Sequence, residues 1–117
     1  MNGWIGVDLD GTLARYDGWN DGAIGEPIPA MVARIKKWLA NGAEVRILTA
    51  RVNPEGRPHR DVAWQLDIIQ EWLRKHIGQE LPITCSKDFC MITLWDDRVV
   101  QVEQNTGEPV DPRWRDK

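Results

Sequence analysis

Short apolar runs recur along the chain and predict strands. Residues 4–9 form a nearly continuous apolar run, which is typical of a central strand covered on both faces. Glycine-containing turns over residues 14–27 indicate a small flap after this strand. Further apolar runs predict strands at 44–49, 82–85 and 91–95, and a fifth, edge strand at 99–102.

Two amphipathic stripes between these runs predict helices. The first helix follows Pro27 and Pro29 and ends at Asn41-Gly42, and its stripe consists of Ile28, Val32, Ile35 and Leu39. The second spans residues 60–77 before Gly78, with a stripe of Val62, Leu66, Ile69 and Leu73. Alternating strands and helices predict an α/β fold, a Rossmann-like three-layer sandwich with a mostly parallel central sheet and helices on both faces.

Length and composition indicate one soluble domain. The chain has 117 residues, 42% hydrophobic and 28% charged, so we expect a single domain over residues 1–117. The net charge of −3 gives no bulk electrostatic case for binding nucleic acid or an anionic membrane. No apolar run reaches the roughly 20 residues of a membrane helix, and the sequence starts without a signal-peptide pattern. We therefore expect a cytoplasmic protein with no membrane partner.

Cysteine and tryptophan usage adds expectations about the core. Cys85 and Cys90 are too few for a disulfide framework and favour a reduced, buried pair. Trp19 lies in the flap, where it either packs against the flap or stacks on a base or sugar. Four tryptophans on expected helices and strands are predicted to lie in the core: Trp38, Trp64, Trp72 and Trp95.

Polar residues follow the predicted strands at the ends where parallel sheets bind ligands. They are Asp8 and Asp10, Thr49, Lys87, and Asp96 and Asp97. Clustered carboxylates repel one another and require a cation, and an open set of carboxylate oxygens suits Mg²⁺. A lysine and a strand-end hydroxyl suit a phosphate group, and Gly11 allows backbone N–H groups to approach an anion. The sequence thus predicts a magnesium-dependent phosphate site.

Four sequence motifs at these strand ends resemble those of the haloacid dehalogenase-like (HAD) hydrolases. The motifs occur in the family's order and are Asp8-Leu9-Asp10-Gly11-Thr12-Leu13, Ile47-Leu48-Thr49-Ala50-Arg51, Ser86-Lys87-Asp88 and Leu94-Trp95-Asp96-Asp97-Arg98. Because Asp stands at position 10, the first motif is similar to the phosphatase branch of the family. The resemblance implies a phosphomonoester phosphatase that needs Mg²⁺ and forms an aspartyl-phosphate intermediate.

The resemblance also implies a role for each site residue. Asp8 would be the nucleophile and Asp10 the general acid and base, while Thr49 and Lys87 would hold the phosphoryl oxygens. The metal would be bound by Asp8, the backbone carbonyl of Asp10, and Asp96 or Asp97. The implied substrate-binding residues are Leu9, Gly11, Thr12, Thr49, Ala50, Arg51 and Lys87.

The loops after the first and second motifs are too short to hold a cap domain. The flap has about 14 residues and the loop after Thr49 about 10, so the chain looks like a capless family member with an open site. It also distantly resembles polynucleotide 3′-phosphatase domains. We therefore expect a phosphorylated small molecule or nucleic-acid end as substrate, with a homo-oligomer or partner subunit as a candidate cover for the site.

Alternatives to this interpretation remain open. Arg51, Arg57, His59 and Arg60 form either a solvated basic loop or a lip that meets a second phosphate or a nucleic-acid backbone. The whole chain is alternatively a receiver-like phosphate-binding module or a catalytically idle HAD fold. A receiver carries its phosphorylated aspartate on a middle strand, whereas here the acidic pair follows the first strand. Turnover of a phosphoester distinguishes an enzyme from an idle fold.

Overall fold

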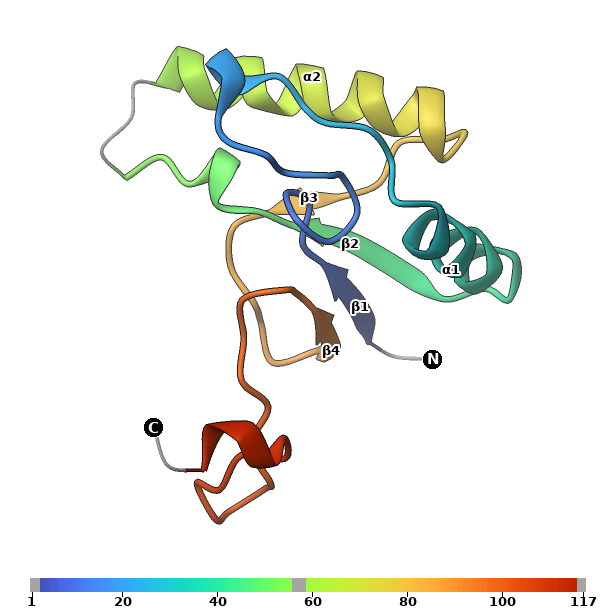
Figure 1. Ribbon diagram of the computed structural model, residues 1–117. Coiled ribbons are helices and arrows are strands. Elements are labelled where there is room, and N and C mark those ends of the chain that lie inside the picture. Colours follow the sequence, from blue (N-terminus) through green and yellow to red (C-terminus); the bar gives the residue numbers. More distant parts are fainter. Residues whose placement is uncertain (1–2, 56–58, 116–117) are drawn as a thin grey trace.

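Four parallel strands form the sheet of this protein (Figure 1). The structure is a computed structural model, and it describes residues 3–55 and 59–115. Strand β1 (Trp4–Val7) lies between β2 (Glu44–Leu48) and β4 (Met91–Trp95), and β3 (Ile83–Thr84) lies beyond β2. The order β3-β2-β1-β4 places the first strand inside the sheet, and the carboxyl ends of β1 and β4 are adjacent.

Two helices connect the first three strands, as expected. Helix α1 (Pro29–Ala40) joins β1 to β2, and α2 (His59–His76) joins β2 to β3. Short 3₁₀ turns are η1 (Asn20–Gly22), η2 (Ala50–Val52) and η3 (Pro112–Trp114). The flap and the η2 loop hold no further helix or strand among the described residues. The α/β fold with a parallel sheet and no cap is therefore confirmed, and no described helix is long and apolar enough to cross a membrane.

The hydrophobic core lies between one face of the sheet and both helices. Val7 of β1 and Ile47 of β2 are paired in register and fully buried. They belong to one apolar cluster together with Ile35 of α1 and Ile69 of α2. Two successive right-handed crossovers in the same direction, from β1 to β2 to β3, leave both helices on the same side. The expected second helical layer is thus not found among the described residues.

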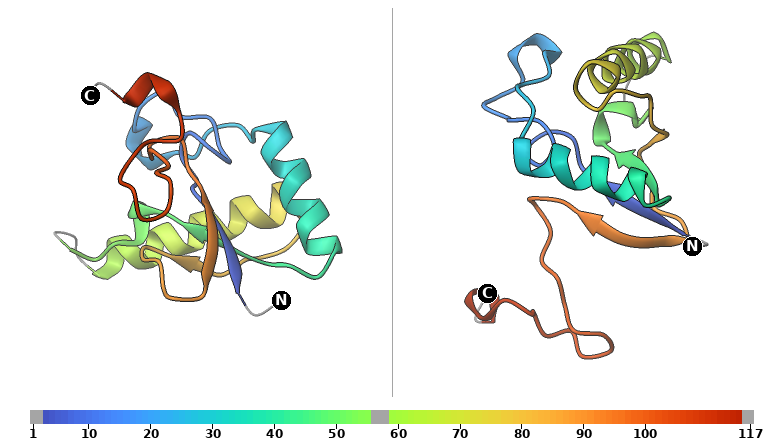
Figure 2. Two further views of the ribbon diagram at one scale, coloured as in Figure 1. Left: turned by 90° about the horizontal axis from the view of Figure 1, so that it is seen from below. Right: turned by 90° about the vertical axis from the view of Figure 1, so that its right-hand side faces the viewer.

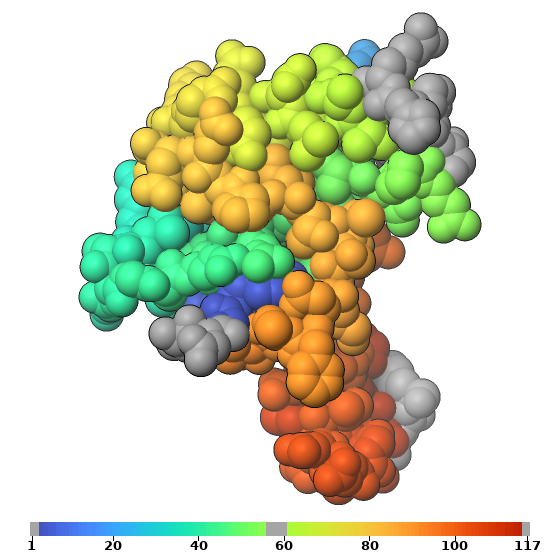
Figure 3. Space-filling model, turned by 180° about the vertical axis from the view of Figure 1, so that it is seen from behind, coloured from blue at the N-terminus to red at the C-terminus, as the bar shows by residue number. Residues whose placement is uncertain are grey.

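The opposite face of the sheet is covered by side chains and a loop instead of a helix. Trp4 is 1% exposed there because the Arg46 guanidinium lies 4.6 Å from its ring centroid. A Cβ at position 6 would come within 3.1 Å of the Trp4 ring, so Gly6 makes room for it. The loop from β3 to β4 crosses this face, where Asp88 accepts a 2.8 Å hydrogen bond from the indole of Trp4. Seen from behind, β1 and β2 reach the surface (Figure 3).

The chain after residue 98 leaves the sheet, so the prediction of a fifth edge strand at 99–102 is wrong. Residues 99–115, here called the C-terminal arm, contain one isolated antiparallel bridge between Val102 and Pro109 and the η3 turn. The arm extends past β4, away from both helices (Figures 1 and 2). Its backbone bonds to itself, as in the 2.8 Å hydrogen bond from the Val110 N–H to the Gln101 carbonyl.

Several burial predictions need correction. Leu66 and Trp64 are 37% and 49% exposed, because the buried face of α2 instead starts at Gln65 and continues through Ile69 and Leu73. Trp95 is 38% exposed on the edge strand, although its ring packs 5.2 Å from that of Trp38. Trp72 is buried, as predicted. Both cysteines are free, but Cys90 is exposed and Cys85 half-buried, so they do not form a buried pair.

Candidate metal and phosphate site

Three carboxylates meet where β1 and β4 end. Asp8 follows β1, and Asp96 and Asp97 follow β4, so the parallel pairing of these two strands brings residues from distant parts of the sequence together. The Asp8 N–H donates a 2.9 Å hydrogen bond to the Trp95 carbonyl and fixes this junction. One carboxylate oxygen from each of the three residues lies within 4.8 Å of the others. Such a set of hard oxygen donors fits a divalent cation like Mg²⁺.

Thr12 and Gly11 hold Asp97 against Asp8. The Thr12 hydroxyl lies 3.3 Å from an Asp8 oxygen and 3.4 Å from an Asp97 oxygen, and it accepts a 3.1 Å hydrogen bond from the Asp97 N–H. Gly11 has φ of 91°, and a Cβ there would lie 2.5 Å from an Asp97 oxygen. Glycine is needed at position 11 because of both the backbone conformation and the close approach of this carboxylate.

The crowding of the carboxylates changes the acidity of Asp8. Burial and the negative charge of Asp96 raise the pKa of Asp8 from 3.8 to about 7, and Asp97 adds to this rise. The hydrogen bond from Thr12 opposes it. Because like charges cannot all ionise at such short range without cost, the cluster favours either a bound proton or a bound cation. This is an electrostatic reason for metal binding that does not depend on any sequence motif.

Asp10 does not join this cluster, because Arg51 holds its carboxylate. The Arg51 Nε lies 2.6 Å from Asp10 Oδ2 and the Nη2 lies 2.9 Å from Asp10 Oδ1. This two-point pair is the strong form of an arginine–carboxylate interaction. It fixes the side chain of Asp10 beside η2 and away from the three carboxylates. Whether the backbone carbonyl of Asp10 binds a metal stays a prediction.

Arg51 is a buried structural residue, so it is neither a solvated side chain of a basic loop nor part of an exposed lip. Its side chain is 3% exposed and donates to the Gly22 carbonyl at 2.7 Å and to Gln65 Oε1 at 3.1 Å. The guanidinium also lies 4.6 Å from the ring centroid of Trp19, a cation–π contact that ties the flap to η2. Arg57 and the side chains of His59 and Arg60 lie outside the described residues.

The remaining predicted site residues occupy different environments. Thr49 is buried, and its hydroxyl accepts a 3.2 Å hydrogen bond from the Arg51 N–H, which starts the η2 turn. Ala50 is exposed, whereas the Leu9 side chain is in the core, so Leu9 can meet a ligand only through its backbone. Lys87 is exposed in the loop after β3, and within the described ranges it makes no hydrogen bond or ion pair. The structure records no contact between Lys87 and the acidic cluster.

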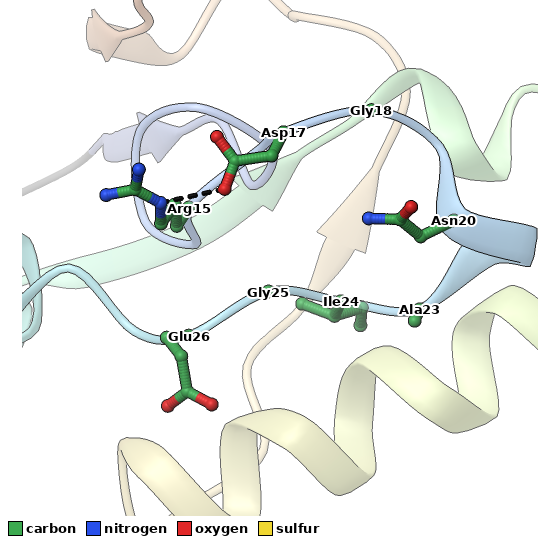
Figure 4. Close-up of a pocket in the computed structure, with 8 residues that line it drawn as sticks. All are labelled: Arg15, Asp17, Gly18, Asn20, Ala23, Ile24, Gly25 and Glu26. Atoms are coloured by element: carbon green, nitrogen blue, oxygen red, sulfur yellow. Dashed lines mark hydrogen bonds and ion pairs between the residues drawn. The ribbon is translucent and has the colours of Figure 1, made fainter.

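A separate hollow of about 230 Å³ lies within the flap (Figure 4). Its lining comes entirely from the segment between Arg15 and Glu26. Arg15 and Asp17 form an exposed 2.8 Å ion pair at its edge, and the side chain of Asn20 points into the loop. No residue of the acidic cluster lines this hollow, so the hollow and the cluster are separate features.

Gln65 is the main site residue that the sequence analysis missed. It is 1% exposed on α2, and its side-chain oxygen accepts a hydrogen bond from the Arg51 guanidinium that holds Asp10. The signal was present, because Gln65 lies four residues before the buried Ile69, on the apolar stripe. A polar side chain on a buried stripe needs a hydrogen-bond partner, and here that partner is Arg51.

Comparisons with protein-family models, with curated proteins and with solved structures found no match to this chain.

Proposed function

We propose that this protein is a Mg²⁺-dependent phosphomonoester phosphatase of the HAD type that acts through an aspartyl-phosphate on Asp8. The observation that carries the proposal is the meeting of Asp8, Asp96 and Asp97 within 4.8 Å at the ends of two adjacent parallel strands. Mg²⁺, when bound by these carboxylates, neutralises the charge of the phosphoryl group and of the cluster. The motif order that resembles the HAD hydrolases supports the same proposal.

In the proposed reaction, a carboxylate oxygen of Asp8 attacks phosphorus and the bond to the leaving oxygen breaks. Asp10 gives its proton to that leaving group. Asp10 then takes a proton from water, whose oxygen attacks the phosphorus of the aspartyl-phosphate and releases inorganic phosphate and free Asp8. Thr49 and Lys87 hold the phosphoryl oxygens in this proposal, which requires Lys87 to approach the cluster when substrate binds.

The ion pair of Asp10 with Arg51 favours a second candidate function, phosphate binding without turnover. A general acid must donate to the leaving group of the substrate. In this arrangement Asp10 is held as an acceptor for two N–H groups. An enzyme would therefore have to release Asp10 from Arg51 during its cycle, whereas a binding module would not.

Turnover measurements distinguish the two candidates. The protein is assayed with Mg²⁺ on phosphorylated metabolites and on 3′- and 5′-phosphorylated oligonucleotides, beside an Asp8→Asn variant. Asp67→Asn, an exposed substitution on α2, is the matched control. We expect the phosphatase to lose roughly a thousandfold or more of its rate in Asp8→Asn and nothing in the control. Mg²⁺-dependent phosphate binding with no turnover of any substrate would instead identify the binding module.

A further inference from the structure

The chain exposes more surface than a compact protein of its mass. Its accessible surface is 8078 Å², whereas a folded monomer of 13.4 kDa is expected to expose about 6,500 Å². The radius of gyration of 15.2 Å likewise exceeds the roughly 13.4 Å expected for a chain of this length. The surplus of about 1,600 Å² is larger than the roughly 800 Å² that each partner buries in a stable protein interface.

Exposed apolar side chains gather on β4, on the loop before it and on the C-terminal arm. Of the twelve large hydrophobic side chains that are exposed in the described part of the chain, eight lie between residues 89 and 114. Phe89 is fully exposed, and Ile92, Val102 and Val110 are each close to half exposed. The arm extends from the sheet without packing against either helix (Figure 2). Exposed apolar side chains that are concentrated in this way mark an interaction surface.

Strand β4 is also an unprotected edge of the sheet. Only β1 pairs with it among the described strands, and its sequence, Met91-Ile92-Thr93-Leu94-Trp95, has no charged residue and no proline. Soluble proteins usually protect such an edge with charges, proline or a covering segment. The edge and the arm lie on the same side of the molecule, beyond β1, as the right-hand view in Figure 2 shows.

We propose that two copies of this chain form a closed homodimer through the β4 edges, with each C-terminal arm lying over the partner's β4. A twofold axis beside β4 places the two edge strands antiparallel, an arrangement in which their backbone groups can pair and continue the sheet. The carboxyl end of one β4, where the arm begins, then lies beside the amino end of the partner strand. Phe89 and Ile92 at that end are the apolar side chains that the arm covers.

The charge of the arm supports a second copy as the occupant. Residues 99–115 carry Glu103, Glu108 and Asp111 against Arg113 and Arg115, so the arm is nearly neutral. Two such arms do not repel each other, and they lack the excess of positive charge that a nucleic-acid partner would require. In a twofold interface, each chain contributes both its β4 edge and its C-terminal arm. The two copies therefore cover both surfaces without a further partner.

The test is the mass of the full chain in solution, measured by light scattering and sedimentation over a wide concentration range. We expect twice 13.4 kDa for the parent. Ile92→Lys places like charges across the twofold axis, and Val110→Asp alters the arm without touching the core. Each should weaken dimerisation at least tenfold, whereas Leu66→Asp, an exposed apolar position on α2, should leave it unchanged.

Circular dichroism confirms that each variant is folded before its mass is interpreted. If Ile92→Lys disturbs the sheet, Val110→Asp still tests the dimer, because Val110 is not a member of the core cluster. A parent that stays monomeric at every concentration would overturn the proposal. So would a dimer that neither variant weakens, or an assembly larger than a dimer, because a twofold edge contact closes at two copies.

Discussion

Arg51 holds Asp10 by both carboxylate oxygens, at 2.6 and 2.9 Å, from a position that is 3% exposed. The same guanidinium donates hydrogen bonds to the Gly22 carbonyl of the flap and to Gln65 of α2. One buried cation therefore joins the first strand-end loop, the flap, η2 and α2. Its removal affects both the fold and the residue that the phosphatase proposal uses as acid and base.

Arg51→Ala is expected to cost about 3–5 kcal/mol of unfolding free energy, because it leaves the Asp10 carboxylate and Gln65 without their partner. Urea denaturation measures this cost. Arg74→Ala is the control, since Arg74 and Glu80 form an exposed ion pair on the surface, and we expect a loss below about 1 kcal/mol. Equal effects of the two substitutions would show that Arg51 has no special structural role.

Gly11→Ala and Gly78→Ala separate backbone strain from contact with the acidic cluster. Both glycines have left-handed φ values, 91° and 96°, so alanine should cost each variant about 1–2 kcal/mol of stability. Only at Gly11 would the new Cβ meet Asp97, whereas Gly78 has open space. We therefore expect a loss of Mg²⁺ affinity of about tenfold or more in Gly11→Ala alone, measured by calorimetry. The same loss in Gly78→Ala would refute the assigned contact.

The raised pKa of Asp8 predicts how stability depends on pH without metal. Between 3.8 and about 7 the folded state holds a proton on Asp8 that the unfolded state has released. Stability in EDTA should thus fall as pH rises through this window, and it should be highest at its acidic end. Thermal melts from pH 4 to 8 measure this fall, and Asp8→Asn should reduce it.

Mg²⁺ should oppose this fall of stability with rising pH. A cation bound between Asp8, Asp96 and Asp97 competes with the proton on Asp8, so the gain in melting temperature on adding Mg²⁺ should be larger at pH 8 than at pH 5. Asp67→Asn should show the same gain as the parent at both pH values. A gain that does not change with pH would place the cation elsewhere.

The sequence predicted the convergence of the acidic residues because parallel topology allows few arrangements. Once strands at 4–9 and 91–95 are expected in one sheet, Asp8 and Asp96 must follow strands that end at the same edge. The presence of helices on only one face of the sheet could also have been predicted from the sequence. Only residues 85–90 separate β3 from β4, which is too short for a helix that would cover the second face.

Arg51 shows what the sequence did not predict. In a loop beside several basic residues and prolines, an arginine has the pattern of a solvated side chain. Its burial depends on three acceptors from distant segments, Asp10, Gly22 and Gln65, and only the folded chain brings them together. Burial of a charge is set by such tertiary partners and leaves no periodic signal along the chain.

The acidic cluster links two strands that are synthesised far apart in time, since 88 positions separate Asp8 from Asp96. During translation β1 can pair with β2 early, but the side of β1 that later receives β4 stays open until residues 91–97 have emerged. Before then Asp8 lacks the neighbouring charges that raise its pKa, and no set of three carboxylates exists to retain a cation. Cation retention by a nascent chain would therefore report that β4 has docked beside β1.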